Sequence, residues 1–249
     1  MSELPFPQYC TKSATEIAAD RYERWDPTVL RQIVLHQCDA LHGGYPGQPV
    51  LDYVRAWLPD IPKAEVLELG CGVGRLLAEI ARQHASWTCT GLDYSTALLK
   101  RAHAAYVRGD AQRVHAARFG WGQPEAVGFR LKNIQFGLAK AEKLPQADST
   151  VDCIVSSFLF DRLEDPLVAL DEWRRALRPG GRLIVVTPLN FYRAKQWAAL
   201  YPPVKLLAAI QQCGWAVLDW REGIEVFEPL DGHGNGVRWV CLGFCLVKA

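Results

Sequence analysis

Residues 66–77 read VLELGCGVGRLL, and this stretch decides the fold. It begins with the successive apolar residues of a buried strand and ends with the spacing of an amphipathic helix. Gly70, Gly72 and Gly74 join the two. Glycine lets the backbone turn tightly and lets a ligand approach without a Cβ in the way. The stretch therefore predicts a ligand-binding turn between a strand and a helix.

The spacing of the glycines excludes two common phosphate sites. A dinucleotide fingerprint has its third glycine one residue later, where this chain has Arg75, and a phosphate-binding loop needs a Gly-Lys-Ser/Thr sequence that is absent. Glu68, just before the turn, would repel a phosphate but could accept a hydrogen bond from an ammonium group. We therefore expect no pyrophosphate at this turn.

An acidic residue follows the turn at an informative distance. The next expected strand ends in Gly91-Leu92-Asp93-Tyr94, so Asp93 lies about 20 residues after the glycines, the spacing at which a carboxylate meets the ribose hydroxyls of a bound nucleoside. Capping of the following helix is the alternative role, and Ser95 serves it better. The sequence therefore predicts that Asp93 binds a ribose.

Continuous apolar runs alternate with helical segments along the chain. Runs of this kind suggest strands covered on both faces, as in a parallel sheet. The expected strands are 66–69, 87–92, 134–138, 151–158, 183–186, 215–218 and 237–247, and the clearest helices are 75–84, 96 to about 118, and 166–178. The alternation predicts an α/β fold in one domain.

The first 60 residues precede the first strand and read mainly as helix. Asp26-Pro27 starts an amphipathic segment that Gly43-Gly44 ends, because Asp caps a helix and Pro is tolerated at its first position. We expect residues 1–60 to form a helical cap or lid over the carboxyl edge of the sheet, and residues 61–249 to form the ligand-binding domain.

Composition excludes several classes of protein. The 249 residues carry 28 Lys+Arg against 27 Asp+Glu, which disfavours a nucleic-acid or acidic-membrane partner. The eight cysteines form no C-x-x-C pair and no cluster with histidine, so no metal site is expected. The chain shows no signal peptide at its start and no run of 18 apolar residues, which predicts a reduced, cytoplasmic protein without a membrane partner.

Five motifs occur in the order of a known family. The segments VLELGCGVGRLL, GLDYS, AEKLP, VDCIVSSFLFDRLEDP and LRPGGRLIVVTP resemble the class I S-adenosylmethionine-dependent methyltransferases, and the resemblance covers roughly residues 60–190. It implies a Rossmann-like sheet of seven mostly parallel strands with helices on both faces and the last strand antiparallel. It also implies S-adenosylmethionine as the cofactor, S-adenosylhomocysteine as its product, and a small-molecule substrate.

The resemblance assigns cofactor-binding roles along the carboxyl edge of the sheet. It places the three glycines with Cys71 at the methionine part, Glu68 near it, and the ribose at Asp93 and Tyr94. Ala141 and Glu142 would contact the adenine edge, and the backbone at Ser157 would lie beside the methionine moiety. The chain departs from the family at Lys140, where an Asp often accepts from the adenine amino group, since Lys cannot accept a hydrogen bond. Either backbone atoms or Glu142 take over this contact, or the motif is shifted by a residue or two.

The substrate side is less marked in the sequence. A methyl group on a sulfonium is already activated, so a general base is needed only when the acceptor must lose a proton. Asp161 is the candidate catalytic residue because it follows the fourth strand, although it could form a surface pair with Arg162. Tyr22 and Trp25 could form an aromatic lid over the substrate or pack on the sheet, and Tyr192 could line the pocket.

A basic segment interrupts the near-neutral chain. Residues 100–132 hold seven basic and two acidic residues, a formal charge of +5, and lengthen one strand connection. A solvated helix face and loop explain them, and docking of an anionic substrate or nucleic acid is the alternative.

We therefore expect methyl transfer to a small molecule such as a quinone, a natural product or an amino-acid-derived metabolite. The alternatives are an RNA or protein methyltransferase that uses the basic segment, an imidazole N-methyltransferase of the mercaptohistidine type, suggested by residues 160–166, and a non-catalytic cofactor-binding module.

Overall fold

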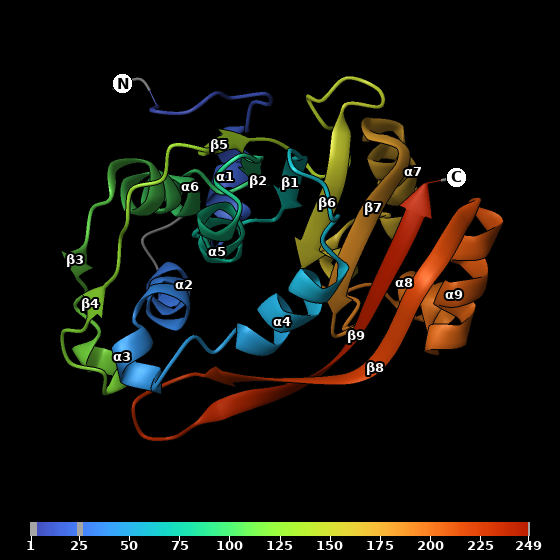
Figure 1. Ribbon diagram of the computed structural model, residues 1–249. Coiled ribbons are helices and arrows are strands. Elements are labelled where there is room, and N and C mark those ends of the chain that lie inside the picture. The colour runs from blue at the N-terminus through green and yellow to red at the C-terminus, as the bar shows by residue number, and fades with distance from the viewer. Residues whose placement is uncertain (1–3, 24–26, 249) are drawn as a thin grey trace.

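A seven-stranded sheet forms the centre of the computed structural model, which describes residues 4–23 and 27–248 (Figure 1). The strand order is β5-β2-β1-β6-β7-β9-β8. The first five strands in this order are parallel, and β9 is antiparallel to both of its neighbours. The strands are β1 (Glu65–Leu69), β2 (Thr88–Asp93), β5 (Ile134–Leu138), β6 (Val151–Ser157), β7 (Leu177–Thr187), β8 (Trp215–Pro229) and β9 (Gly236–Lys248). The expected fold, including the antiparallel last strand, is confirmed.

Helices cover both faces of this sheet. One face packs against α4 (Gln48–Trp57), α5 (Arg75–Gln83) and α6 (Thr96–His103), and the other against α7 (Pro166–Ala176), α8 (Ala194–Leu200) and α9 (Pro203–Gln212). Successive side chains of a strand point to opposite faces. In β1, Val66 therefore joins one apolar cluster while Leu67 and Leu69 join the other. Burial on both sides is why the strand is apolar at successive positions.

The helix expected from residue 96 to about 118 is much shorter in the structure, so this expectation was wrong. After α6 the chain makes a π-helical turn over Ala104–Arg108 and leaves it at Gly109, whose φ of 86° is left-handed. Glycine at such a position ends helices. Beyond it lie a two-stranded hairpin, β3 (Gln112–Arg113) and β4 (Glu125–Ala126), and a 3₁₀ turn over Ala117–Phe119.

The chain begins against one edge of the sheet. The Tyr9 N–H donates to the Leu138 carbonyl of β5 at 2.8 Å, and the Leu138 N–H donates to the Pro7 carbonyl at 3.0 Å. The helices α1 (Ala14–Ala19), α2 (Pro27–Gln37) and α3 (Asp39–His42) follow. The described N-terminal residues thus form an extended segment on β5 followed by short helices.

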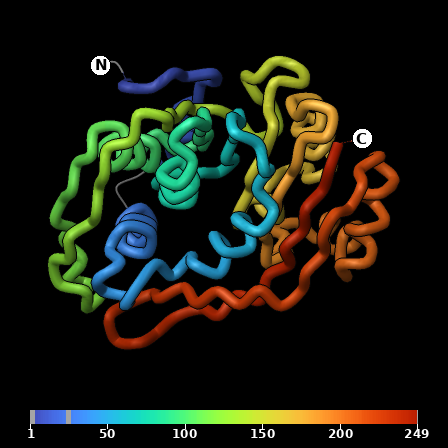
Figure 2. The backbone as a smooth tube through the Cα atoms, in the orientation of Figure 1, coloured from blue at the N-terminus to red at the C-terminus, as the bar shows by residue number. Residues whose placement is uncertain are grey.

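Strands β8 and β9 extend past the sheet as a long hairpin. It passes below α4 and reaches the 3₁₀ turn that precedes β4, where the Gly232 N–H donates to the Phe119 carbonyl at 2.7 Å (Figure 2). The sequence predicted only residues 215–218 as the first of these strands. His233 lies in the turn that connects the two strands of the hairpin. No helix within residues 4–23 and 27–248 has the length and hydropathy needed to span a bilayer.

Candidate cofactor and substrate site

The carboxyl ends of β1, β2 and β6 open into one cavity of about 1430 Å³. Pockets for a single small ligand usually measure about 300–1,000 Å³. The glycine turn forms one side, and α2, the β8–β9 hairpin and the segments after β6 and β7 form the others. The cavity therefore has room for two molecules side by side.

The glycine turn is held by β2 and open toward the cavity. Gly70 N–H and Cys71 N–H donate to the Leu92 carbonyl at 2.8 and 3.1 Å. At Gly72, with φ of 55°, an added Cβ would meet no described heavy atom within 4 Å. Gly74 is different, because its Cβ would come within 2.7 Å of the Phe136 ring and because it is not among the described residues that line the cavity. Its role is close helix packing, which differs from the expected ligand contact.

Asp93 lies at the end of β2 and faces the cavity. Its carboxylate accepts from the Gly72 N–H at 2.8 Å and from the Ser95 N–H at 2.7 Å, so it ties the glycine turn to the start of α6. Burial raises the pKa of Asp93, and the two backbone N–H groups oppose this rise. A carboxylate has about four lone-pair sites, so Asp93 can still accept from two hydroxyl groups.

Glu68 is a buried carboxyl at the cavity floor, with an exposed fraction of 2%. One oxygen accepts from the Leu77 N–H at 3.0 Å. Burial raises the pKa of Glu68, the hydrogen bond from Leu77 opposes this rise, and the resulting pKa is about 8. A cationic group in the cavity would stabilise the ionised form.

Comparison with known proteins relates this site to methyltransferases. Residues 67–185 match the family model described as a methyltransferase domain. The matched segment is a methyltransferase domain that makes up just under half of the chain, and the comparisons support a class I S-adenosylmethionine-dependent methyltransferase. The matched residues include Asp93 and all three glycines of the turn, and S-adenosylmethionine is the cofactor of this methyltransferase family.

Two curated relatives and one solved structure illustrate the match. Trans-aconitate 2-methyltransferase from Deinococcus radiodurans is 29% identical over 138 residues, 55% of this chain and 43% of that protein. The ubiquinone/menaquinone biosynthesis C-methyltransferase from Haemophilus ducreyi is 48% identical over 54 residues, 22% of this chain and 21% of that protein. A methyltransferase structure from Aquifex aeolicus shares the fold with a TM-score of 0.54 and 18% identity, covering 91% of this chain and all of the other. The chain thus spans less than half the length of these two curated relatives.

The residues present fit the cofactor. The backbone at Gly72 leaves the space that a close-lying ligand needs, Asp93 has spare acceptor capacity, and Glu68 is a carboxyl placed for a cation. Most of the other expected cofactor residues also line the cavity: Gly70, Cys71, Tyr94, Ala141, Glu142 and Ser157.

The departure at Lys140 has a structural explanation. Its ammonium forms an ion pair with Glu16 of α1 at 3.1 Å, and the Tyr94 hydroxyl donates to the same carboxylate at 2.8 Å. Glu16 also accepts hydrogen bonds from Ser13. The bonds from Ser13, Tyr94 and Lys140 together lower the pKa of Glu16 to about 2. Lys140 therefore holds the N-terminal segment in place, while Glu142 stays on the cavity wall.

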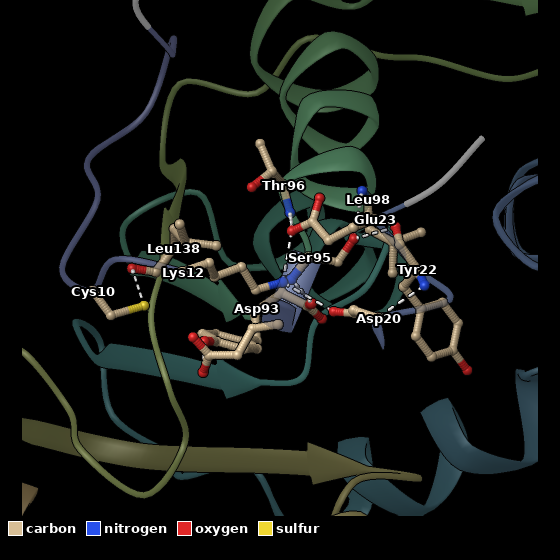
Figure 3. Close-up of polar contacts among 12 residues, drawn as sticks. Cys10, Lys12, Asp20, Tyr22, Glu23, Asp93, Ser95, Thr96, Leu98 and Leu138 are labelled. Carbon is tan, nitrogen blue, oxygen red and sulfur yellow. Dashed lines mark hydrogen bonds and ion pairs between the residues drawn. The ribbon is translucent and has the colours of Figure 1, made fainter. Parts of the chain in front are cut away.

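A buried lysine fixes the same segment from inside. Lys12, with a side chain 3% exposed, contacts Asp20 at 2.9 Å and Glu23 at 2.6 Å, and its ammonium lies 4.0 Å from the centre of the Tyr94 ring. Figure 3 shows it reaching between these carboxylates beside Asp93. The Thr96 N–H donates to Glu23 at 2.8 Å. The network brings Asp20 and Tyr22 to the cavity wall.

Asp161 does not face the cavity, in contrast to the expectation of a catalytic group. It is fully buried and accepts from the Thr187 hydroxyl at 3.0 Å and the Asn190 N–H at 3.1 Å. These bonds tie the turn after β6 to the turn after β7. The geometry therefore gives Asp161 a positioning role.

The expected substrate residues have different outcomes. Tyr22 and Tyr192 line the cavity. The Arg162 guanidinium lies 4.3 Å from the centre of the Tyr192 ring, which is 62% exposed. Trp25 lies outside the described residues.

A polar stripe on α2 lines the cavity and was not predicted from the sequence. Thr28, Arg31, Gln32 and His36 recur at helical spacing and line the cavity, while the opposite stripe of α2 is buried in an apolar cluster. His36 Nδ1 lies 3.2 Å from the Tyr45 hydroxyl. Burial lowers the pKa of His36 to about 4. The apolar periodicity of α2 could have indicated these residues, because a helix with one buried apolar stripe presents its other side to solvent or to a cavity.

The basic segment is partly used inside the protein. Arg101 is buried and donates to the side chain of Gln37 and to the carbonyls of Ala126 and Val127, and Arg108 pairs with Asp110. These contacts reduce the positive surface available for an anionic partner.

Proposed function

We propose that this methyltransferase transfers a methyl group from S-adenosylmethionine to a small-molecule acceptor bound in the half of the cavity beyond the glycine turn. The supporting observation is that one cavity runs from Gly72 and Asp93 to walls built by α2 and the β8–β9 hairpin. A ligand between these walls would lie away from bulk water beside the cofactor.

The chain's own groups would divide the work as follows. Asp93 would accept hydrogen bonds from the ribose hydroxyls, and the Glu68 carboxylate would neutralise the ammonium group of the methionine part. The glycine turn would let the cofactor approach the backbone closely. Bound S-adenosylmethionine supplies an activated methyl group on a sulfonium. The remaining task of the protein is to align the acceptor and exclude water.

His36 can hydrogen-bond the acceptor molecule as a neutral imidazole, and its low pKa makes it a weak proton acceptor. It is neutral at pH 7 because burial lowers its pKa to about 4, and Tyr45 orients its ring through Nδ1. Asp161 is buried among its own hydrogen-bond donors and faces no acceptor.

The names of the relatives support an acceptor of modest size. The proteins from Deinococcus radiodurans and Haemophilus ducreyi are named for trans-aconitate and for ubiquinone or menaquinone synthesis. The matches cover 43% and 21% of these two relatives.

Calorimetry with S-adenosylmethionine tests the cofactor, and transfer of labelled methyl from it to a metabolite mixture tests the reaction. We expect binding in the micromolar range and a labelled product of low molecular mass. Absence of binding at millimolar cofactor would refute the proposal. Label found only in RNA or protein would refute the small-molecule acceptor.

A further inference from the structure

Two aromatic side chains from distant parts of the sequence meet on one wall of the cavity. Phe158 follows the carboxyl end of β6, and Trp239 lies on β9. Their ring centres are 6.0 Å apart with planes at 77°, an edge-to-face contact. Both line the cavity and are half-buried.

The backbone at Phe158 is strained. Its φ of 55° is left-handed, a region that bulky residues rarely adopt and that costs free energy. The Phe158 N–H donates to the Val186 carbonyl at 2.9 Å and so holds this conformation. Strain of this kind persists where the surrounding structure enforces it, often at ligand sites. Here it accompanies a ring on the cavity wall, directly after Ser157.

Trp239 is fixed by a bond across the hairpin. Its indole N–H donates to Glu228 of β8 at 2.7 Å, which satisfies the single polar group of the ring. What remains for the cavity is an apolar aromatic surface. Val226, Phe227 and Val237 of the same hairpin also line the cavity, so the wall beside Trp239 is apolar apart from Glu228, whose carboxylate accepts from the indole N–H.

We propose that Phe158 and Trp239 bind the ring of a planar aromatic or conjugated acceptor, and that they select it over saturated molecules of the same size. The inference rests on the proposed function, whose acceptor it specifies. Aromatic rings attract one another in edge-to-face and offset arrangements beyond the effect of buried area. A saturated ring is thicker and lacks the charge distribution of an aromatic ring, so it would bind this wall less well.

The test uses 1-anilinonaphthalene-8-sulfonate, a dye that carries a planar naphthalene ring, titrated by fluorescence into the folded protein with and without saturating S-adenosylhomocysteine. We expect one dye per chain in both conditions. We also expect 2-naphthol to displace the dye at least tenfold better than decahydro-2-naphthol, which has the same carbon skeleton.

Variants locate the dye on the wall. Trp239→Ala and Phe158→Leu should each weaken dye binding by about tenfold, the upper end for loss of an aromatic pair, and Trp239→Phe should lose less. Val240→Ala is the matched control, because Val240 is the next residue on β9, is 59% exposed and is not among the described cavity residues. Melting temperatures of all four variants show whether each one folds.

Equal dye affinity in folded Trp239→Ala and Val240→Ala would overturn the inference. So would equal displacement by the two naphthols, or loss of the dye on adding S-adenosylhomocysteine, which would assign the wall to the cofactor. Failure of the cofactor to bind by calorimetry would instead defeat the proposed function, and the dye titration without cofactor would still decide the aromatic wall.

Discussion

Lys12 should control whether the N-terminal segment stays on the cofactor site. Its ammonium is buried against the carboxylates of Asp20 and Glu23, whose side chains are 21% and 7% exposed. Lys12→Met keeps an unbranched apolar side chain that is one heavy atom shorter and removes the charge. Both carboxylates then lose their cation, and breaking a buried pair in this way costs about 3–5 kcal/mol.

The cost should appear as local opening and leave global stability nearly unchanged. Helix α1 buries none of its side chains, and the extended segment is tied to β5 by the two backbone bonds at Leu138 and by burial of Phe6. Detaching the segment is therefore easier than unfolding the sheet. A loss of about 3 kcal/mol corresponds to roughly a hundredfold more frequent opening.

Amide hydrogen exchange measures this opening directly. The Tyr9 N–H, bonded to Leu138, should exchange about a hundredfold faster in Lys12→Met, while amides of β1 keep their protection. Cofactor should also dissociate faster, because Asp20 and Tyr22 leave the cavity wall with the segment.

Lys140→Met is the matched control. It removes a lysine that also contacts the segment, but this pair is exposed, at 46% for Lys140 and 41% for Glu16, and exposed pairs contribute at most about 1 kcal/mol. Less than about a fivefold change in Tyr9 exchange is expected. Equal effects of the two variants, or none at Tyr9 in Lys12→Met, would refute the assignment of Lys12 as the main anchor.

Three further predictions concern carboxyl groups of the site. Asp93→Asn should weaken cofactor binding by roughly tenfold to a hundredfold by calorimetry, because one acceptor oxygen becomes a donor that opposes a backbone N–H; unchanged affinity would mean that Asp93 does not bind the ribose. Burial raises the pKa of Glu68 to about 8, so its protonated carboxyl stabilises the fold fully below about pH 4.5, and this contribution is lost as the pH rises to 8. Glu68→Gln should therefore reduce the fall in the free energy of unfolding between these pH values, measured by denaturant titration. Parallel curves for the variant and the original protein would contradict this prediction. Asp161→Asn should lower the free energy of unfolding by about 1–3 kcal/mol, because it weakens the hydrogen bonds to Thr187 and Asn190. The pH profile of methyl transfer should stay unchanged. A shifted profile would mean that Asp161 is a catalytic group.

The sheet and the cofactor half of the site could be predicted from the sequence because local patterns encode them. A strand buried on both faces, such as β6, is apolar at successive positions, and the glycine turn lies between a strand and a helix that are adjacent in sequence. Gly74 shows the limit of this reasoning. Its place in the motif predicts the turn but does not tell ligand contact from close packing, which depends on Phe136, 62 residues later.

The long hairpin was underestimated for a related reason. The outer part of β8 buries Ile224 and Val226 and exposes Glu225 and Phe227, an alternation typical of a strand with one covered face. A search for continuous apolar runs finds the inner part of β8, which lies within the sheet, and misses the outer part.

The proposed acceptor half of the cavity combines Phe158 from the middle of the sequence with residues from segments near its two ends. Residues on α2 and near Tyr45 form one wall, and residues on the β8–β9 hairpin form another, so just over 200 residues separate His36 from Trp239. Only the folded sheet brings them together, and neither segment lies in the matched part of the family model. A methyltransferase can therefore keep the central segment for the cofactor while the terminal segments change the acceptor. It follows that exchange of the hairpin between relatives should alter acceptor choice and leave cofactor affinity largely intact.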